Sequence, residues 1–107
     1  MEDAGIIDNA MTFLEKLRDP DVEFVQVKFT KKDGSERLMK CTLNFDKIPR
    51  TDQPKSVNLP RILKLLKDNG IIHVYDLEKQ GWRSVPFRKT EWLMTDDNKR
   101  YRIRPRG

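Results

Sequence analysis

Few side chains in this sequence have the chemistry of a catalyst or a metal ligand. The chain holds one histidine, His73, and one cysteine, Cys41. A zinc site usually takes three or four nitrogen or sulfur ligands, so these two residues are too few. A cysteine–histidine nucleophile would also need a third group that orients the base. We therefore expect Cys41 to be a small buried hydrophobic residue and His73 to be a structural residue of a strand.

The carboxylates and glycines add no catalytic motif. The acidic residues are scattered over the predicted helix, turns and loops, and none of the five glycines belongs to a phosphate-binding loop. Asp76 is expected to lie near Arg83 in a hairpin, where an ion pair accounts for both residues. The sequence thus predicts a protein that is not an enzyme and that uses no cofactor and no metal ion.

The most distinctive charged cluster is the basic tail, residues 99–107. Its basic residues are Lys99, Arg100, Arg102, Arg104 and Arg106. In a strand, the arginines at 100, 102 and 104 share one face and Tyr101 and Ile103 share the other. Guanidinium groups bind phosphate through paired donors, which favours nucleic acid as a partner. The alternative is a charged edge strand that prevents aggregation, or a partner for an acidic helix.

A second candidate surface combines aromatic and basic side chains. Tyr75 and Trp82, facing outward beside Arg83, Arg88 and Lys89, would form a platform of the kind on which bases stack. Tryptophan and arginine are equally typical anchors of protein–protein interfaces. Burial of Trp82 in the core is the other interpretation.

Length and charge indicate a small basic protein. The 107 residues suit one domain, residues 1–107, and their net charge is +5. Residues 1–23 carry a local net charge of −5, whereas residues 99–106 carry +5. No disulfide can form within the chain, and neither a signal peptide nor a membrane span is apparent. We expect a cytoplasmic protein without membrane contact.

The N-terminal part predicts an acidic helix over about residues 6–18. Apolar residues recur there at helical spacing, namely Ile7, Met11, Leu14 and Leu17. Asp8 or Asn9 can cap its start. Pro20 disfavours helical geometry in the preceding residue, so the helix should end by Asp19.

A hairpin is predicted next, with strands over 23–31 and about 36–44. A two-residue loop would place the two apolar sets on opposite faces. A three-residue loop with Gly34 in a bulge pairs Val27 with Met39 and Val25 with Cys41, and it buries both sets together. We therefore choose the three-residue loop.

Residues 45–60 contain three prolines and predict an irregular loop anchored by Ile48. A short helix should follow from Pro60 to Asp68, with Asn69 and Gly70 as its stop and the buried side formed by Ile62, Leu63, Leu65 and Leu66.

A second hairpin, 71–77 with 82–87, has a four-residue loop that would pair Val74 with Val85 and Asp76 with Arg83. This places Ile72, Val74, Val85 and Phe87 on one face, and Tyr75 and Trp82 on the other. A three-residue loop would reverse the faces. Trp92 and Leu93 should close the core, and a last strand should cover 100–103.

These elements predict an α+β, mostly β, fold. About five short strands with hairpin connections favour a small SH3-like antiparallel barrel over about 23–103, because closure removes exposed strand edges. An N-terminal helix would pack across one end, and a short helix would be inserted between the two hairpins.

Several stretches also resemble a known family. They are Phe29-Thr30-Lys31-Lys32-Asp33-Gly34, Arg37, Met39, Cys41-Thr42-Leu43, Ile48-Pro49, Val74-Tyr75-Asp76-Leu77-Glu78-Lys79 and Gly81-Trp82-Arg83-Ser84. Together they resemble small SH3-like barrel proteins of unknown function from T4-like tailed bacteriophages. The resemblance covers roughly residues 24–88, and the insertion 59–70 looks longer than the family pattern. It implies a phage origin, a bacterial host cytoplasm and the barrel fold, and it implies no activity.

Two functions follow from the sequence. One is a non-catalytic module that binds RNA or DNA through the basic and aromatic surface. The alternative is a protein-binding module that modulates a host complex of the transcription, translation or defence machinery.

Overall fold

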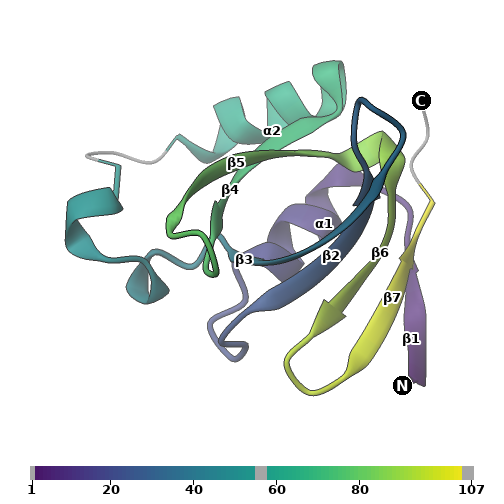
Figure 1. Cartoon of the computed structure of the whole chain (residues 1–107), viewed down its shortest axis with the longest axis horizontal. Coiled ribbons are helices and arrows are strands. Elements are labelled where there is room, and N and C mark those ends of the chain that lie inside the picture. The colour runs from purple at the N-terminus through teal and green to yellow at the C-terminus, as the bar shows by residue number, and fades with distance from the viewer. Residues whose placement is uncertain (1, 55–57, 105–107) are drawn as a thin grey trace.

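The computed structural model describes residues 2–54 and 58–104, although the side chains of Glu2 and Asp3 are left undescribed. Seven strands form one strongly curved sheet, accompanied by two α-helices (Figure 1). The strands are β1 (Glu2–Ile7), β2 (Val25–Thr30), β3 (Glu36–Thr42), β4 (Ile71–Asp76), β5 (Gly81–Pro86), β6 (Thr90–Thr95) and β7 (Lys99–Ile103). The helices are α1 (Ala10–Leu17) and α2 (Leu59–Asn69), with 3-10 turns η1 (Phe45–Lys47), η2 (Arg50–Asp52) and η3 (Phe87–Lys89).

The sheet order is β1-β7-β6-β2-β3-β4-β5. Neighbouring strands are antiparallel except β1 and β7, which run parallel. The mostly β class is confirmed, as is the insertion of α2 between the two hairpins. Two strands, β1 and β6, were not expected from the sequence.

The first hairpin has the predicted register. Val25 lies opposite Cys41 and Val27 lies opposite Met39. The Lys31 amide donates to the Ser35 carbonyl at 2.8 Å, which leaves a three-residue loop with Gly34 at φ +88°. A positive φ costs glycine little, so the bulge forms at that residue. The inward residues of both strands, Val25, Val27, Phe29, Met39 and Cys41, are buried.

The second hairpin has the expected four-residue loop but a different register. Asp76 lies opposite Gly81 and Val74 lies opposite Arg83, so the predicted Val74–Val85 and Asp76–Arg83 pairs are wrong by two residues. A shift of two residues keeps every side chain on its face. Ile72, Val74 and Val85 are therefore buried as expected.

Asp76 forms an ion pair with Arg37 of the first hairpin. The Arg37 guanidinium donates to the Asp76 carboxylate at 2.7 Å, and that carboxylate is 1% exposed. The other carboxylate oxygen accepts from the amides of Glu78 and Lys79 at 3.0 and 3.1 Å. Asp76 thus ties β3 to β4 and also fixes the β4–β5 turn, so the predicted ion pair with Arg83 is wrong.

The N-terminal helix is shorter than predicted. Helix α1 begins at Ala10, and the Asn9 side chain caps it by accepting from the Thr12 amide at 2.9 Å. Ile7 belongs to β1 instead, because β1 is hydrogen-bonded along β7. The buried face of α1 consists of Ala10, Phe13, Leu14 and Leu17, whereas Met11 is 46% exposed. The end of the helix at Leu17 agrees with the prediction.

The first part of the basic tail, residues 99–103, forms the inner strand β7. Strand β7 lies between β6 and β1, so the edge-strand interpretation is wrong. Tyr101 and Ile103 pack against the core, as expected from their alternation. Parallel pairing with β1 places the acidic positions 2 and 3 opposite Lys99 and Arg100. Arg106 lies outside the described residues.

The segment between β3 and α2 covers the face on which Tyr75 and Trp82 lie. The Tyr75 hydroxyl donates to the Asp52 carboxylate at 2.5 Å, and the Trp82 indole N–H donates to the Asp52 carbonyl at 2.9 Å. Tyr75 is 1% exposed and Trp82 is half-buried. The predicted outward platform is wrong, because η2 closes over it. Ile48 anchors the same segment, as expected.

The cross-hairpin ion pair gives a stability prediction. Arg37→Gln should lower the free energy of unfolding by about 2–3 kcal/mol, between the values for exposed and buried pairs, because Asp76 stays buried without its cation. Arg83→Gln removes an exposed arginine and should cost within about 0.5 kcal/mol. Urea denaturation measures both. If Arg83→Gln lowers the free energy of unfolding more than Arg37→Gln does, the assignment of Arg37 as the partner of Asp76 is wrong.

The Asp52 contact gives a pH prediction. The hydrogen bond to Asp52, aided by burial, raises the pKa of Tyr75 to about 12 from a usual value of 10.0. The hydroxyl therefore stabilises the fold fully below pH 10, and this contribution is lost as the pH rises toward 12. The stability difference between the wild type and Tyr75→Phe should shrink over that range in urea titrations. With Asp52→Ala as the background, the difference should change less over this range, because only burial then raises the pKa of Tyr75.

Candidate functional site

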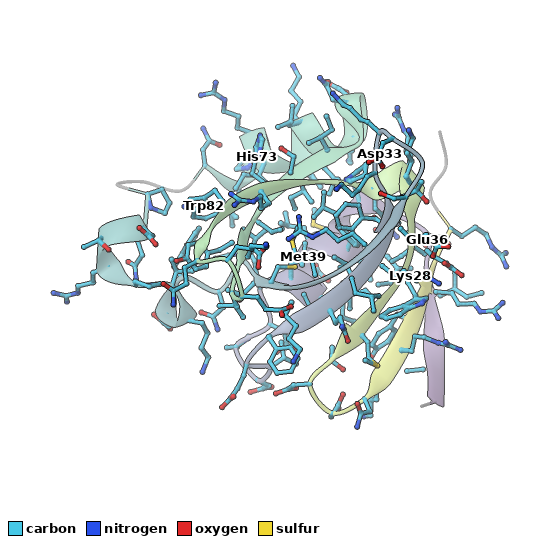
Figure 2. The ribbon with its side chains drawn as sticks, viewed as in Figure 1. Lys28, Asp33, Glu36, Met39, His73 and Trp82 are labelled. Carbon is cyan, nitrogen blue, oxygen red and sulfur yellow. The ribbon has the colours of Figure 1, made fainter. Side chains whose placement is uncertain are left out.

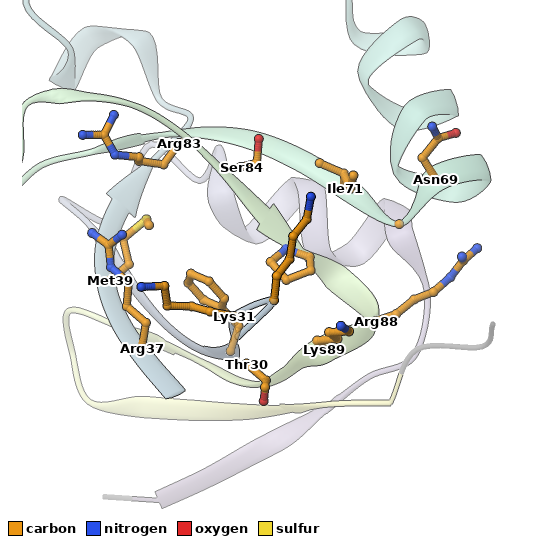
Figure 3. A pocket seen from close by; sticks show the side chains of 14 residues that line it. Thr30, Lys31, Arg37, Met39, Asn69, Ile71, Arg83, Ser84, Arg88 and Lys89 are labelled. Atoms are coloured by element: carbon orange, nitrogen blue, oxygen red, sulfur yellow. The ribbon is translucent and has the colours of Figure 1, made fainter. Parts of the chain in front are cut away.

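A cavity opens where the two hairpins diverge. Strands β3 and β4 share only two residue pairs, Cys41 with Asp76 and Thr42 with Tyr75. Beyond these pairs the ribbons separate and enclose a space of about 460 Å³. Figure 3 shows Arg37 and Met39 of β3 on one side of the opening and Arg83 and Ser84 of β5 on the other. We call this space the hairpin pocket.

Basic side chains surround the hairpin pocket. Of its fourteen described lining residues, six are basic and none is acidic. They come from the first hairpin (Lys31, Lys32 and Arg37), from β5 (Arg83) and from η3 (Arg88 and Lys89). Three separate segments thus place basic side chains around one space, although Arg37 is paired with Asp76.

Backbone contacts hold two of the arginines. Arg88 donates to the Lys67 carbonyl at 3.2 Å, and Arg83 donates to the Trp82 carbonyl at 2.8 Å. Arg88 also lies against Gly70, where an added Cβ would come within 3.1 Å of the arginine side chain. Gly70, at φ +67°, therefore lets α2 end beside Arg88.

The three lysines of the hairpin pocket are exposed, and Lys31 acts on a carboxylate only at longer range, that of Asp33. Within the described parts of the chain, Lys31, Lys32 and Lys89 form no ion pair of 4.0 Å or less. The nearby Asp33 faces its own turn, where the Ser35 hydroxyl and amide lower the pKa of its carboxyl.

The interior of the hairpin pocket is apolar. Phe29, Met39, Ile71 and Pro86 line it. Phe29 and Met39 are 5% and 2% exposed and belong to the core, whereas Ile71 is 36% exposed. Thr30, Asn69 and Ser84 add hydroxyl and amide groups. The lining thus combines apolar side chains with hydroxyl, amide and basic groups.

The structure divides the predicted site residues into three groups. Arg83, Arg88 and Lys89 meet in the hairpin pocket. Tyr75 and Trp82 instead hold the segment around Asp52, with their rings in an edge-to-face arrangement 5.7 Å apart. Trp82 and His73 lie near each other on the same face of the second hairpin (Figure 2).

The tail residues form a separate surface. Arg100, Arg102 and Arg104 line a cavity of about 350 Å³ together with Glu91, Trp92 and Ile103. Lys99 is exposed and lies 3.8 Å from the Asp97 carboxylate. Next to this surface, Lys28 bridges Glu36 at 2.9 Å and Glu91 at 3.2 Å, and these contacts raise the pKa of the Lys28 ammonium (Figure 2). The tail surface therefore includes an acidic side chain, unlike the hairpin pocket.

Lys31, Lys32 and Arg37 were missed as site residues. In the sequence Lys31 ends the first predicted strand, Lys32 begins the turn, and Arg37 alternates with Met39 and Cys41 on one face of the second strand. Their one signal was the Lys31-Lys32 pair beside Gly34, which is also typical of a solvated hairpin tip. Only the path of the second hairpin brings them to Arg83 and Arg88.

The residues considered for catalysis lie apart. Cys41 is fully buried, as expected, and burial raises the pKa of its thiol far above the usual range. His73 is exposed in β4, with Nδ1 3.0 Å from the Ser84 hydroxyl. Among residues 2–54 and 58–104, no group of three or more His, Cys, Asp or Glu side chains is placed to hold a metal ion.

No helix in the described ranges is long and apolar enough to span a membrane.

Comparison with known proteins gives one match. No curated protein and no solved structure matches the chain significantly. A family model matches residues 14–89, which include the end of α1, both hairpins, α2 and η3. The chain therefore belongs to the family described as WYL_2, Sm-like SH3 beta-barrel fold, and the expected small SH3-like fold is confirmed.

Proposed function

We propose that this protein binds nucleic acid through the hairpin pocket and works without catalysis. The observation that carries the proposal is the composition of the lining, six basic residues from three segments and no acidic one among the described residues. Arginine presents a planar fork to phosphate oxygens, and lysine adds point charges. A phosphate backbone is the polyanion that such a mixture fits.

The hairpin pocket suits this role better than the tail surface. Glu91 lines the tail cavity, and Glu36 lies beside it through Lys28. Carboxylates repel phosphate, so Glu91 and Glu36 weaken the positive electrostatic potential at the tail surface. The residues proposed to bind are Lys31, Lys32, Arg37, Arg83, Arg88 and Lys89, with the tail residues Lys99, Arg100, Arg102 and Arg104 as a secondary surface.

A protein partner is the second candidate function. Helices α1 and α2 border a mainly apolar groove of about 620 Å³ that includes Met11, Leu14, Leu59 and Leu63. Met11 is 46% exposed there. Such a groove would suit a module that modulates a host protein complex.

The origin and location follow from the resemblance alone. We propose that the protein is phage-encoded and acts in the cytoplasm of a bacterial host. The residues that support this are the first-hairpin motif, Phe29 to Gly34, and the second-hairpin motif, Val74 to Ser84.

Salt dependence of binding tests the proposal. A labelled single-stranded oligonucleotide should bind at low salt, and affinity should fall as salt rises, because each neutralised phosphate releases counterions. Lys32→Gln/Lys89→Gln should reduce the slope of log K against log salt by about 1.4, or about 0.7 for each lost contact to a single strand. Fluorescence anisotropy over a salt series measures this slope.

A matched double variant controls for net charge. Lys47→Gln/Lys64→Gln removes two exposed lysines from η1 and α2, outside the hairpin pocket. It should leave the slope nearly unchanged. If both double variants reduce the slope equally, binding depends only on the net charge of the protein, and the proposed site is wrong.

The tail surface gives a separate prediction. Lys99→Gln/Arg104→Gln also removes two positive charges. It should reduce the slope of log K against log salt by less than about 0.7, the value for one lost phosphate contact. The same anisotropy series measures it. A larger effect here than in Lys32→Gln/Lys89→Gln would make the tail the primary binding surface.

A further inference from the structure

A second concave space lies between α2, the second hairpin and the segment that follows β3. Its volume is about 510 Å³, which is within the range of small-ligand sites. Helix α2 packs beside β4 (Figure 1), and Trp82 and His73, which lie near each other on one face of the second hairpin (Figure 2), both line this space. We call it the helix pocket. Among the described lining residues it shares only Ile71 with the hairpin pocket, so the two sites can be altered separately.

The helix pocket has an aromatic wall that is held in place. Trp82 is partly buried, and its indole N–H donates to the Asp52 carbonyl at 2.9 Å, which fixes the ring. Phe45 is partly buried in η1, where the Gln53 side-chain amide donates to the carbonyls of Phe45 and Ile48, each at 2.8 Å. These contacts order both rings before a ligand arrives, which lowers the entropic cost of binding.

Aliphatic side chains form the rest of the apolar lining. Leu43 and Ile72 belong to the buried core, with 2% and 1% exposure. Ile62 and Leu65 of α2 are partly buried and complete the lining beside them. An aromatic ring has no polar group that burial would leave unpaired, and it packs favourably edge-to-face against other rings. The apolar lining therefore suits an aromatic ligand.

The exposed polar side chains of the helix pocket carry no negative charge. They are Asn58, Arg61 and His73, and the described lining includes no carboxylate. Within the described ranges, Arg61 forms no ion pair of 4.0 Å or less. The Nδ1 of His73 lies 3.0 Å from the Ser84 hydroxyl. In the tautomer in which Nδ1 accepts from that hydroxyl, Nε2 carries the ring hydrogen and can donate it to an anion.

The size of this positive charge favours a carboxylate. A single guanidinium presents a planar fork that matches the two oxygens of one carboxylate. The hairpin pocket, with six basic lining residues, is better matched to the higher charge of phosphate groups. We infer that the helix pocket binds a small aromatic monocarboxylate, with the ring against Trp82 and the carboxylate on Arg61 and His73. This site is separate from the proposed nucleic-acid surface and does not depend on it.

Tryptophan fluorescence tests this inference. The chain has two tryptophans, and Trp92 lies in the tail cavity, so Trp92→Phe leaves Trp82 as the single reporter. Phenylpropionate should change the fluorescence of this variant saturably, with a Kd of about 1 mM or less, as expected for a ligand of that size. Phenylpropionamide lacks the charge and acetate lacks the ring. Each should therefore bind at least about tenfold more weakly.

A matched pair of variants locates the carboxylate. In the Trp92→Phe background, Arg61→Gln should weaken phenylpropionate binding about tenfold, because the charge-assisted hydrogen bonds are lost. Lys64→Gln removes an exposed lysine of the same helix that does not line the pocket. Its affinity should stay within about twofold, since exposed charges are screened by salt. In amide NMR spectra of the wild type, the ligand should shift the signals of Arg61, His73 and the Trp82 indole N–H.

Several results would overturn this inference. One is the absence of a saturable fluorescence change, and another is equal affinity for phenylpropionate and its amide. Equal losses in Arg61→Gln and Lys64→Gln would mean that binding follows net charge alone. Chemical-shift changes confined to Lys31, Arg83 and Lys89 would place the acid in the hairpin pocket instead. Each of these results leaves the nucleic-acid proposal intact, because the oligonucleotide salt series tests that proposal on its own.

Discussion

The buried carboxylate of Asp76 joins the two hairpins, and the rest of the architecture depends on that junction. One oxygen accepts from Arg37 of the first hairpin, and the other accepts from the amides of the second hairpin's turn. A buried charge is tolerated only when it is paired and its hydrogen bonds are made, and both conditions are met here. Because β3 and β4 pair at just two positions beside this carboxylate, the ribbons meet at one end and separate at the other. The hairpin pocket is a consequence of that geometry.

The distribution of charge follows from the same geometry. Asp76 neutralises Arg37 in part, and Glu36 and Glu91 lie on either side of Lys28 on the outer face. The acidic residues of the N-terminal strand run parallel to the basic strand β7. Glu36, Glu91 and Asp76 are thus paired within the fold, whereas Lys31, Lys32 and Lys89 form no ion pair of 4.0 Å or less among the described residues. A modest net charge of +5 can therefore produce a concentrated positive field at one place.

Local patterns in the sequence were sufficient to predict the first hairpin and the faces of the second. Gly34 and the need to bury Val27 with Met39 selected one register, and the structure has it. In the second hairpin the predicted register was wrong by two residues, yet Val74 and Val85 are still buried since an even shift preserves the face.

Long-range pairing was not predictable in the same way. Ile7 fitted a helical period, and only the parallel partner β7 makes it part of a strand. Tyr75 and Trp82 were placed on the correct face, but η2 covers that face through Asp52. The pocket combines Lys31 with Arg88, residues that no local pattern connects.

The parallel pairing of β1 with β7 has a consequence for how the protein folds. Glu2 lies opposite Lys99, so these strands come from nearly opposite ends of the described chain. During synthesis, β1 emerges first and must wait for β7, whereas each hairpin can form as soon as its own strands are available. Pairings between residues distant in sequence close large loops and are slow to form. Folding should therefore proceed from the hairpins outward, with β1 docking last, and a stalled or truncated chain would expose an unsatisfied strand to aggregation.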